Sequence, residues 1–340
     1  RRAPEAVPGA RAQIRDEVSD DTRWMAEADA LGERGRGRTA PNPNAGCLIV
    51  RDGEVVGRGW TQPGGRPHAE AIALSEASKR ARGATVYVTL EPCAHVSDRG
   101  PACADLLAEA GVERVVAAIG DPDARVDGQG FERLRAAGIK VEVGSGAEQA
   151  SRSMAGFLTR VRLGRPYVTP KLAMSIDGKI ALPSGESKWI TGEDARAHVH
   201  LERARTDMIL VGRGTYERDK PQLDVRLPGL EEQSPRRAIL TRGDGPAGWT
   251  RLSSHANIYG LHDVHDLLVE GGSGAASAFL VEDLVDRMLI YRAPLLIGEG
   301  KSSVGYIGLT SLVDAHRRWQ LTDTRPLGMD RLEVYERVRT

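Results

Sequence analysis

One histidine and two cysteines in the first third of the chain have the residue types and the order of a zinc-binding set. His68 opens the motif H-A-E, Cys93 ends the motif E-P-C, and Cys103 follows after nine further residues. An imidazole and two thiolates suit zinc, and a catalytic zinc keeps three protein ligands and leaves its fourth position for water. Glu70 need not bind the metal, because a carboxylate two residues after the histidine can carry the proton of that water. The spacing therefore predicts a hydrolytic metal site.

The order H-x-E, then P-C, then a second cysteine is typical of zinc deaminases that act on nucleosides and nucleobases. Each residue also has an ordinary explanation on its own: His68 as a surface or core histidine, and Cys93 and Cys103 as small buried apolar residues. Their order and ligand types together favour the metal site. The common deaminase motif has two residues between its cysteines, whereas this chain has nine, which indicates a distinct subfamily.

The composition is that of a two-domain globular chain. The 340 residues suffice for two domains, and 47 basic residues balance 47 acidic ones, which argues against a nucleic-acid-binding surface. Three cysteines leave no pair for a disulfide once two bind metal, which fits a reducing cytoplasm. No apolar run is long enough to span a membrane. Residues 1–19 lack the apolar core of a secretory signal and are expected to form a mobile arm.

The segments around the metal motif alternate between strand and helix, which predicts an α/β sheet covered by helices. His68 opens one of the helices, and Cys93 comes just beyond a β-rich segment, where the sites of α/β proteins lie. The expected helices are 20–34, 68–79, 104–110, 128–137 and 147–163, and the expected strands are 47–50, 55–60, 84–90, 112–119 and 139–143.

A turn at residues 164–166 predicts a boundary between a first domain of residues 20–164 and a second domain of residues 165–340. The segment 270–274, E-G-G-S-G, lies between a strand and a helix and could bind an anion through backbone N–H groups. It lacks the full spacing of a dinucleotide fingerprint, and a tight turn that uses glycine for shape alone is the alternative. The second domain is expected to contain strands 167–173, 208–211, 237–240, 266–269, 284–291 and 295–297 and helices 193–205 and 275–281.

Motifs in both halves of the chain resemble those of one family. The first half contains TAPNPNAG, HAE and EPCAH, and the second half contains KLAMSIDG, SGESKWIT and VEGG, in this order. With these motifs the chain resembles the bifunctional deaminase–reductases of riboflavin biosynthesis from about residue 20 to its C-terminus. The resemblance implies an α/β fold class with an N-terminal cytidine-deaminase-like α/β/α domain and a C-terminal dihydrofolate-reductase-like α/β domain.

The activity that the resemblance implies has two steps. The first domain would hydrolyse the 2-amino group of 2,5-diamino-6-(5-phosphoribosylamino)pyrimidin-4(3H)-one, with zinc on His68, Cys93 and Cys103 and with Glu70 as the catalytic residue. The second domain would reduce the ribosyl chain of 5-amino-6-(5-phosphoribosylamino)uracil to a ribityl chain. The implied cofactors are Zn²⁺ and NADPH, although the sequence shows no unambiguous ligand for the 2′-phosphate that distinguishes NADPH from NADH. The implied partner is the small-molecule substrate, with neither nucleic acid nor membrane, and the implied assembly is a cytoplasmic homo-oligomer formed through the reductase domain.

The resemblance also assigns site residues. Asn42 and His95 match contacts with the pyrimidine, although His95 could also be a plain loop histidine. The cofactor of the second domain is matched to Ala173, Trp189, Thr215, Asp219, Gly272, Ser273, Gly274, Ala275, Ala276, Ser277 and Ala278. Its substrate is matched to Ser187, Arg203, Leu223, Arg226 and Glu270, with Lys171 and Asp177 of the KLAMSIDG motif added to them. Arg203 and Arg226 suit a phosphate because guanidinium groups bind it bidentately.

Some of these residues have structural alternatives, and the chain departs from the family pattern in places. Arg203 could lie on a solvated helix face, and Lys171 and Asp177 could form an ordinary strand-end ion pair. One extra residue lies between the two cysteines, which a loop accommodates at small cost. Lys220 stands where the family motif D-D-P-x-L-T-V-R has its second aspartate, and the segment 229–262 is short. The last two departures concern the adenosine end of the cofactor.

Two rival functions are left open by the sequence. One is a single-function deaminase of free nucleosides or tRNA with a non-catalytic second domain, and the neutral charge and the SGESKWIT loop argue against it. The other is a reductase whose deaminase half persists only as a scaffold, and the altered cysteine spacing is its one support. Bound zinc distinguishes an active first domain from a scaffold.

Overall fold

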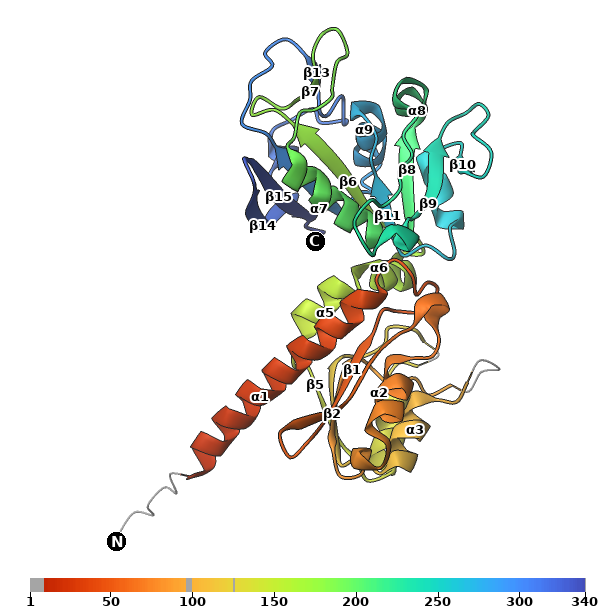
Figure 1. Ribbon diagram of the computed structural model, residues 1–340, viewed down its shortest axis with the longest axis vertical. Helices are drawn as coiled ribbons and strands as arrows, with labels where there is room; N and C mark the ends of the chain where they lie inside the picture. Colours follow the sequence, from red (N-terminus) through yellow and green to blue (C-terminus); the bar gives the residue numbers. More distant parts are fainter. Residues whose placement is uncertain (1–8, 96–99, 125, 340) are drawn as a thin grey trace. The chain divides into compact units, whose positions relative to one another are not determined.

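The computed structural model describes residues 9–95, 100–124 and 126–339, and the chain divides into two compact units between Arg162 and Leu163. Figure 1 shows that each unit has a central sheet with helices packed against it. No helix in the described ranges combines the length and the apolar character needed to cross a bilayer.

The first unit is a five-stranded sheet between two layers of helices. Its strands are β1 Gly46–Arg51, β2 Glu54–Trp60, β3 Thr85–Leu90, β4 Arg114–Ile119 and β5 Lys140–Val143, and its helices are α1 Gly9–Gly32, α2 Ala69–Ala77, α3 Cys103–Ala110, α4 Gln129–Ala136, α5 Ala147–Ser153 and α6 Ala155–Leu163. The strand order is β2-β1-β3-β4-β5, with β1 antiparallel to both neighbours and β3, β4 and β5 parallel. Helices α1 and α5 cover one face, and α2 and α3 cover the other (Figure 1). Ile49, Val86 and Val115 are fully buried because both faces are covered.

Helix α1 is longer than the sequence predicts. It begins at Gly9 rather than at Asp20, and its added turns contain Ala, Arg, Gln and Glu, which are good helix formers. The expected mobile arm of residues 1–19 is therefore corrected over residues 9–19, which are helical, while residues 1–8 lie outside the described residues. Helix α2 ends at Ala77 instead of Lys79, and a 3₁₀ turn over Ser78–Ala81 follows it.

The second unit is built on one large, mostly parallel sheet. Its strands are β6 Tyr167–Met174, β7 Lys179–Ala181, β8 Met208–Gly212, β9 Arg236–Leu240, β10 Thr250–Leu252, β11 Asp266–Val269, β12 Arg287–Arg292, β13 Lys301–Ser302, β14 Trp319–Leu327 and β15 Asp330–Arg337, and its helices are α7 Glu193–Ala204, α8 Arg213–Asp219 and α9 Ser273–Val281. Eight strands pair in the order β10-β9-β8-β11-β6-β12-β15-β14, with only β15 and β14 antiparallel to their neighbours. The parallel strands therefore present their carboxyl ends at one edge, where α/β sites lie.

The expected strand at residues 295–297 is wrong, because the turn after β6 takes the backbone groups of this segment. The N–H of Ile176 donates to the carbonyl of Leu295 at 2.9 Å. The N–H groups of Ile297 and Gly298 donate to the carboxylate of Asp177 at 3.2 and 2.8 Å. A short apolar run predicts a strand, but here a side chain replaces the neighbouring strand as the partner.

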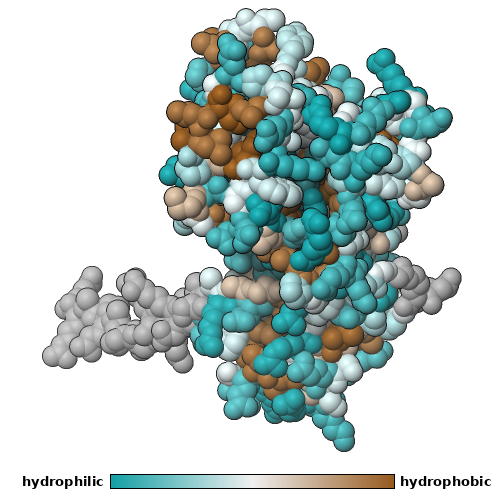
Figure 2. Space-filling view, turned by 45° about the horizontal axis from the view of Figure 1, so that its top comes forward, coloured by the Kyte–Doolittle hydropathy of each residue, from teal (hydrophilic) through white to brown (hydrophobic). Residues whose placement is uncertain are grey.

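Exposed large apolar side chains are concentrated in the second unit. Among the described residues, all of them except Val143 lie in that unit, and Tyr306, Leu312 and Met329 are 78%, 81% and 85% exposed. Figure 2 shows apolar side chains gathered on one area of this unit. An apolar area of this kind is commonly a surface of interaction with another molecule.

Candidate functional sites

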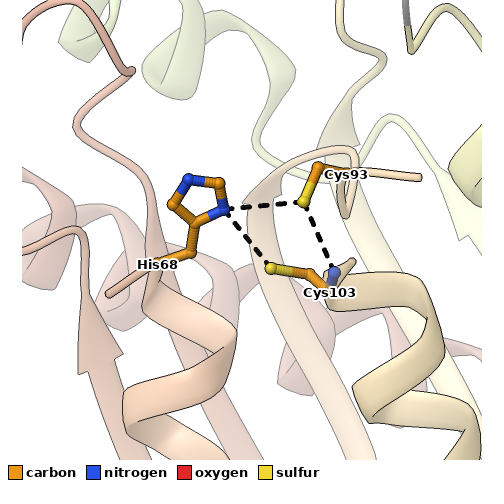
Figure 3. Close-up of side chains that lie close together, drawn as sticks. All are labelled: His68, Cys93 and Cys103. Atoms are coloured by element: carbon orange, nitrogen blue, oxygen red, sulfur yellow. Dashed lines mark hydrogen bonds between the residues drawn. The ribbon is translucent and has the colours of Figure 1, made fainter. Parts of the chain in front are cut away.

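His68, Cys93 and Cys103 bring one nitrogen and two sulfurs together in the first unit (Figure 3). Nδ1 of His68 lies 3.6 Å from Sγ of Cys93 and 3.4 Å from Sγ of Cys103, and the three ligand atoms all lie within 4.8 Å of one another. Both cysteines are buried and the histidine is half-buried. The extra residue between the cysteines does not separate them, and the three atoms could hold one metal ion.

The starts of two helices place these three side chains. His68 directly precedes α2, and Cys103 is the first residue of α3. The N–H of Cys103 points at Sγ of Cys93 at 3.4 Å, and the N–H of Ala104 donates to the carbonyl of Cys93 at 3.1 Å. Hydrogen bonds and the positive ends of helices both stabilise a thiolate. A hydrogen bond from the side chain of Cys103 lowers the pKa of Cys93, and the same side-chain pairing raises the pKa of Cys103.

Glu70 lies in the first turn of α2, and its side chain neighbours the three ligand residues. It is 4% exposed, and burial raises the pKa of its carboxyl group, while the imidazole of His68 opposes the rise. Cys93 raises this pKa further. A carboxyl group whose pKa is shifted toward neutrality can both accept and donate a proton during one reaction. The position and the environment of Glu70 therefore suit acid–base chemistry beside the three atoms that could hold a metal ion.

Asn42 lies against His68, and His95 follows Cys93 by two residues; the family resemblance matches both to the pyrimidine. The amide nitrogen of Asn42 lies 2.8 Å from the carbonyl oxygen of Gly65 and 2.9 Å from Nε2 of His68, the ring nitrogen that faces away from the sulfurs. Nδ1 of His95 is buried and has no hydrogen-bond partner in the described parts of the chain. A buried polar atom without a partner is unusual and has capacity for a ligand.

Two glycines of β2 allow α2 to pack close to the sheet. A Cβ on Gly59 would collide with the carbonyl oxygen of Ala69 in the first turn of α2, and one on Gly57 would collide with that of Ala73. The residues of α2 that face the strand are buried alanines. This close approach fixes the helical turn that His68 opens. Neither glycine could be identified as a functional residue from the sequence. A glycine in a strand indicates that another segment packs closely against it, but not which segment.

Gly59→Ala is expected to weaken metal binding by about 10- to 100-fold, the usual effect of disturbing the residues that support metal ligands. The added methyl group must push the turn that carries His68 and Glu70 away from its position. Competition with a chelator measures the change. Gly120→Ala is the matched control, because a Cβ there meets its nearest neighbour at 3.6 Å, an ordinary contact. Unchanged metal affinity in Gly59→Ala would contradict the positioning role of this glycine.

Glu91 of the E-P-C motif is a further residue whose role the sequence does not reveal. It is 3% exposed and comes directly after β3. Its carboxylate accepts hydrogen bonds from the N–H groups of Gly128, Gly130 and Phe131 at 3.0, 2.8 and 3.4 Å. It also accepts one from the N–H of Asp121, in the loop after β4, at 3.2 Å. These bonds hold the start of α4 against the segment that carries Cys93. The sequence feature that could have indicated this role is a charged residue directly after a buried strand.

Lys171, Arg203 and Glu270 form a buried charged cluster in the second unit. Glu270 directly follows β11, and Arg203 donates to its carboxylate through Nε at 2.6 Å and Nη2 at 2.9 Å. Nζ of Lys171 lies 4.0 Å from the same carboxylate. Burial works against the charge of Glu270, but the guanidinium of Arg203 brings the pKa of this carboxyl below its ordinary value. Burial lowers the pKa of Lys171. Arg203 also donates to the carbonyl of Asp224 at 2.9 Å, so it lies inside the fold and not on a solvated helix face.

The other residues matched to the second site lie on turns and helix ends. Thr215 Oγ1 accepts the N–H of Gly272 at 3.1 Å, which ties α8 to the glycine-rich turn. Trp189 is 68% exposed, and the guanidinium of Arg196 lies 4.7 Å from the centre of its ring. Arg226 is exposed. Ala173 lies in β6, Asp219 ends α8, the residues Ser273, Gly274, Ala275, Ala276, Ser277 and Ala278 belong to α9, Ser187 lies in the loop after β7, and Leu223 is buried.

Asp177 serves as a hydrogen-bond acceptor in the turn after β6. The hydroxyl of Ser175 donates to it at 2.6 Å, and this bond, with those from the N–H groups of Gly298 and Ile297, lowers the pKa of Asp177 to about 2. The ionised carboxylate thereby holds two loops together. A strand-end ion pair was the structural alternative to the substrate role matched to Asp177, and the contacts of this residue are hydrogen bonds within the described chain instead.

Known proteins similar to this chain span nearly its whole length. The chain is 37% identical over 359 residues to the riboflavin biosynthesis protein RibD of Escherichia coli K12, a match that covers 91% of this chain and 97% of that protein. It is 40% identical over 313 residues to RibD of Mycobacterium tuberculosis H37Rv, with 87% and 91% covered. The solved structure of Acinetobacter baumannii RibD matches with a TM-score of 0.85 at 36% identity and covers 95% of this chain and 100% of that one. A Thermotoga maritima structure, described as a diaminohydroxyphosphoribosylaminopyrimidine deaminase/5-amino-6-(5-phosphoribosylamino)uracil reductase, matches with a TM-score of 0.85 at 31% identity and the same coverage.

Two family models divide the chain between them. The zinc-binding region of cytidine and deoxycytidylate deaminases matches residues 18–119, and the RibD C-terminal domain matches residues 166–246 and 258–332. Together with the fold and the convergent histidine and cysteines, these matches define the class as a bifunctional enzyme, a deaminase joined to a reductase. The chain belongs to the RibD family of riboflavin biosynthesis proteins. The fold class expected from the sequence, a cytidine-deaminase-like domain followed by a dihydrofolate-reductase-like domain, is confirmed.

Proposed function

We propose that the first unit deaminates 2,5-diamino-6-(5-phosphoribosylamino)pyrimidin-4(3H)-one and that the second reduces 5-amino-6-(5-phosphoribosylamino)uracil with NADPH, within domains of residues 20–164 and 165–340. The convergence of His68, Cys93 and Cys103 around one point carries the proposal. The activities named for the Thermotoga maritima protein, which is similar over its whole length, support the choice of substrates. If the first unit were only a non-catalytic scaffold, the convergence of three potential metal-ligand atoms beside a buried carboxylate would have no explanation.

The donor set fits zinc. In a tetrahedral site with Zn–N of about 2.0 Å and Zn–S of about 2.3 Å, the nitrogen and each sulfur are about 3.5 Å apart. Nδ1 of His68 lies 3.6 and 3.4 Å from the two sulfurs, so the residues need little movement to take the ion. Bound there, zinc would supply a Lewis acid that makes water reactive at neutral pH.

Glu70 would move the protons of the hydrolysis. Its carboxylate takes a proton from the attacking water and gives it to the ring nitrogen beside the amino-bearing carbon. It then carries the second proton of that water to the amino group, which leaves as ammonia while the carbon keeps the oxygen. The raised pKa of Glu70 suits a group that must both accept and release a proton. Asn42 and His95 would hold the pyrimidine in place, and Nδ1 of His95, which has no hydrogen-bond partner among the described residues, supports this role.

The second unit would bind a nicotinamide cofactor at the edge where its parallel strands end. The N–H groups at the start of α9, with Gly272 before it, suit a pyrophosphate, and Thr215 holds this turn. NADPH would supply the hydride for the sugar carbon. Glu270 and Lys171 would contact the sugar, Arg203 would fix the carboxylate of Glu270, and the exposed Arg226 would bind the phosphate. The remaining residues matched to this site keep their proposed roles of lining the cofactor and the substrate.

A homo-oligomer formed through the second unit completes the proposal. The exposed large apolar side chains of the described residues lie almost entirely in that unit, which supports a protein interface there. The proposed partner is otherwise only the phosphoribosylaminopyrimidine substrate.

Ammonia release and NADPH oxidation, both followed on the diaminopyrimidinone phosphate, test the proposed function. The purified chain should release one ammonia and then oxidise one NADPH for each substrate molecule. Ammonia from cytidine or tRNA, with none from this substrate, would favour a single-function deaminase. NADPH oxidation only on the already deaminated substrate would favour a scaffold role for the first unit.

A further inference from the structure

We propose that Tyr291 is a positioning residue of the second site: the face of its ring holds the ammonium group of Lys171 and stabilises that group in its charged form. The hydroxyl of the same ring is held in turn by His198. This inference rests on the proposed reductase function, in which Lys171 contacts the sugar. Tyr291 lies outside the set of residues that the family motifs match to the site.

Two neighbouring parallel strands place Tyr291 beside Lys171 on one face of the sheet. β12 pairs with β6 so that Leu289 lies opposite Lys171 and Tyr291 lies opposite Ala173. Residues two apart on a strand point to the same face, so these four side chains share one face of the sheet. Tyr291 and Leu289 pack in one apolar cluster with Val199 of α7, so this face is the one that α7 covers.

The ammonium group of Lys171 lies among one carboxylate, one guanidinium and the ring of Tyr291. Glu270 and Arg203 are the charged groups that act on it, and Nζ lies 4.0 Å from the carboxylate and 5.9 Å from the centre of the ring. Burial lowers the pKa of Lys171, Glu270 raises it and Arg203 lowers it. Because Arg203 already bonds to the carboxylate through two nitrogens at 2.6 and 2.9 Å, the contact left to Lys171 is the long one.

The ring of Tyr291 supplies the attraction that this crowded ion pair lacks. An aromatic ring attracts a cation through the negative charge of its face, and the attraction is strongest where water is excluded. Tyr291 is fully buried, so its ring acts on Lys171 in the surroundings where it is most effective. Unlike a second carboxylate, the ring adds no buried charge that would itself need a counter-ion. It therefore opposes the effect of burial and of Arg203 on the charge of Lys171.

His198 on α7 fixes the orientation of the ring. Its Nδ1 lies 2.9 Å from the hydroxyl oxygen of Tyr291, which is the distance of a hydrogen bond. Burial raises the pKa of Tyr291 and lowers the pKa of His198, so at neutral pH the phenol keeps its proton and donates a hydrogen bond to an uncharged imidazole. A buried tyrosine hydroxyl usually has such a partner. The charged groups that act on this pair are Glu202, Glu270, Arg205, Arg287 and Arg325.

The pH dependence of kcat/KM for NADPH oxidation on the deaminated substrate tests the inference. The proposed contact with the sugar uses Lys171 as an ammonium donor, so reduction should fall as the pH rises through the pKa of Lys171. Removing the ring removes stabilisation of the charged form and so lowers this pKa. Tyr291→Leu should therefore move the alkaline limb of the profile to lower pH by about 0.5–1.5 pH units, which corresponds to the attraction of a buried ring. Tyr291→Phe keeps the ring and should leave the limb within about 0.3 pH units of its position in the unaltered chain.

An NMR titration of Lys171 gives a second reading that does not depend on turnover. In the chain labelled at the ε-carbon of lysine, the signal of Lys171 is the one missing from Lys171→Arg. Its midpoint should fall in Tyr291→Leu by the same amount as the kinetic limb and should stay unchanged in Tyr291→Phe. Ile258→Ala, which removes a fully buried side chain from another apolar cluster of this unit, controls for lost core volume and should leave the midpoint unchanged. If Tyr291→Leu does not fold, Tyr291→Met, whose flexible apolar chain fills the space without a ring, takes its place.

The two readings separate failure of the inference from failure of the proposed function. An unchanged midpoint without the ring, or an equal shift in Ile258→Ala or Tyr291→Phe, would overturn the role of the ring and leave the reductase in place. A shifted midpoint with an unchanged kinetic limb would show that reduction does not depend on this proton and would overturn the positioning role. If the unaltered chain oxidises no NADPH on the deaminated substrate, the proposed reductase function fails and the positioning role fails with it.

Discussion

Glu70→Gln is expected to lower the rate of ammonia release by about 10²- to 10⁴-fold, the usual contribution of a positioned acid–base group. Glutamine keeps the shape of the buried side chain but can neither accept the proton of the attacking water nor deliver it to the ring. The change should leave zinc in place, because Glu70 is not one of the three residues whose ligand atoms converge. Single-turnover ammonia release and zinc content, measured on the same sample, provide the two readings.

The matched control for Glu70 lies on the same helix. Glu76→Gln changes a carboxylate whose side chain is 46% exposed and that pairs with Arg58, and it should leave deamination unchanged. NADPH oxidation on the deaminated substrate should continue at the unaltered rate in both variants. If Glu70→Gln lowered both activities equally, the two-site account would be wrong.

Glu270→Ala is expected to abolish reduction and to destabilise the second unit. Removing this carboxylate leaves the guanidinium of Arg203 and the ammonium of Lys171 buried without their counter-ion. Breaking one side of a buried ion pair lowers the free energy of unfolding by about 3–5 kcal/mol. Displacement of the groups proposed to hold the sugar should lower kcat/KM of reduction by at least about 10²-fold. Urea unfolding and NADPH oxidation measure the two effects.

Glu270→Gln separates the chemical effect from the structural one. The amide keeps one acceptor for Arg203 and should fold more stably than the alanine variant, yet reduction should still fall because the charge is lost. Deamination should continue in both variants, since the proposed metal ligands belong to the other unit. Glu282→Ala, a carboxylate that is 49% exposed just after α9, is the control. Reduction within about threefold of the unaltered rate in Glu270→Gln would remove Glu270 from the proposed site.

The three residues whose nitrogen and sulfur atoms converge could be predicted from the sequence because few kinds of side chain suit zinc. The motifs H-A-E and E-P-C, with one later cysteine, narrowed the choice to His68, Cys93 and Cys103. The pattern could not predict that their side chains converge in space. His68 and Cys103 are 35 residues apart in the sequence, and the packing of α2 and α3 beside the end of β3 brings them together. The roles of Glu91 and of the two glycines of β2 could not be predicted for the same reason. Their contacts are with backbone groups of distant segments, which no local sequence pattern indicates.

The limits of the fold prediction have similar physical causes. The strands β9 and β11 were found because they are short apolar runs, but the position of β11 between β8 and β6 depends on tertiary pairing. The hairpin of β14 and β15 was missed because β14 is a largely exposed edge strand without a clear alternation of apolar and polar residues. In contrast, the family motifs matched Lys171, Arg203 and Glu270 to the substrate one by one, and their pairing with one another within the fold emerged only from the structure.

X-ray absorption at the zinc edge, together with metal content, tests the central claim most directly. The account predicts one zinc per chain, with two sulfur ligands at about 2.3 Å and the remaining ligands nitrogen or oxygen at about 2.0 Å. In Cys103→Ala the sulfur contribution should fall to one atom or the metal should be lost. A chain isolated without zinc that also fails to take it up, or a zinc spectrum without sulfur, would contradict the account.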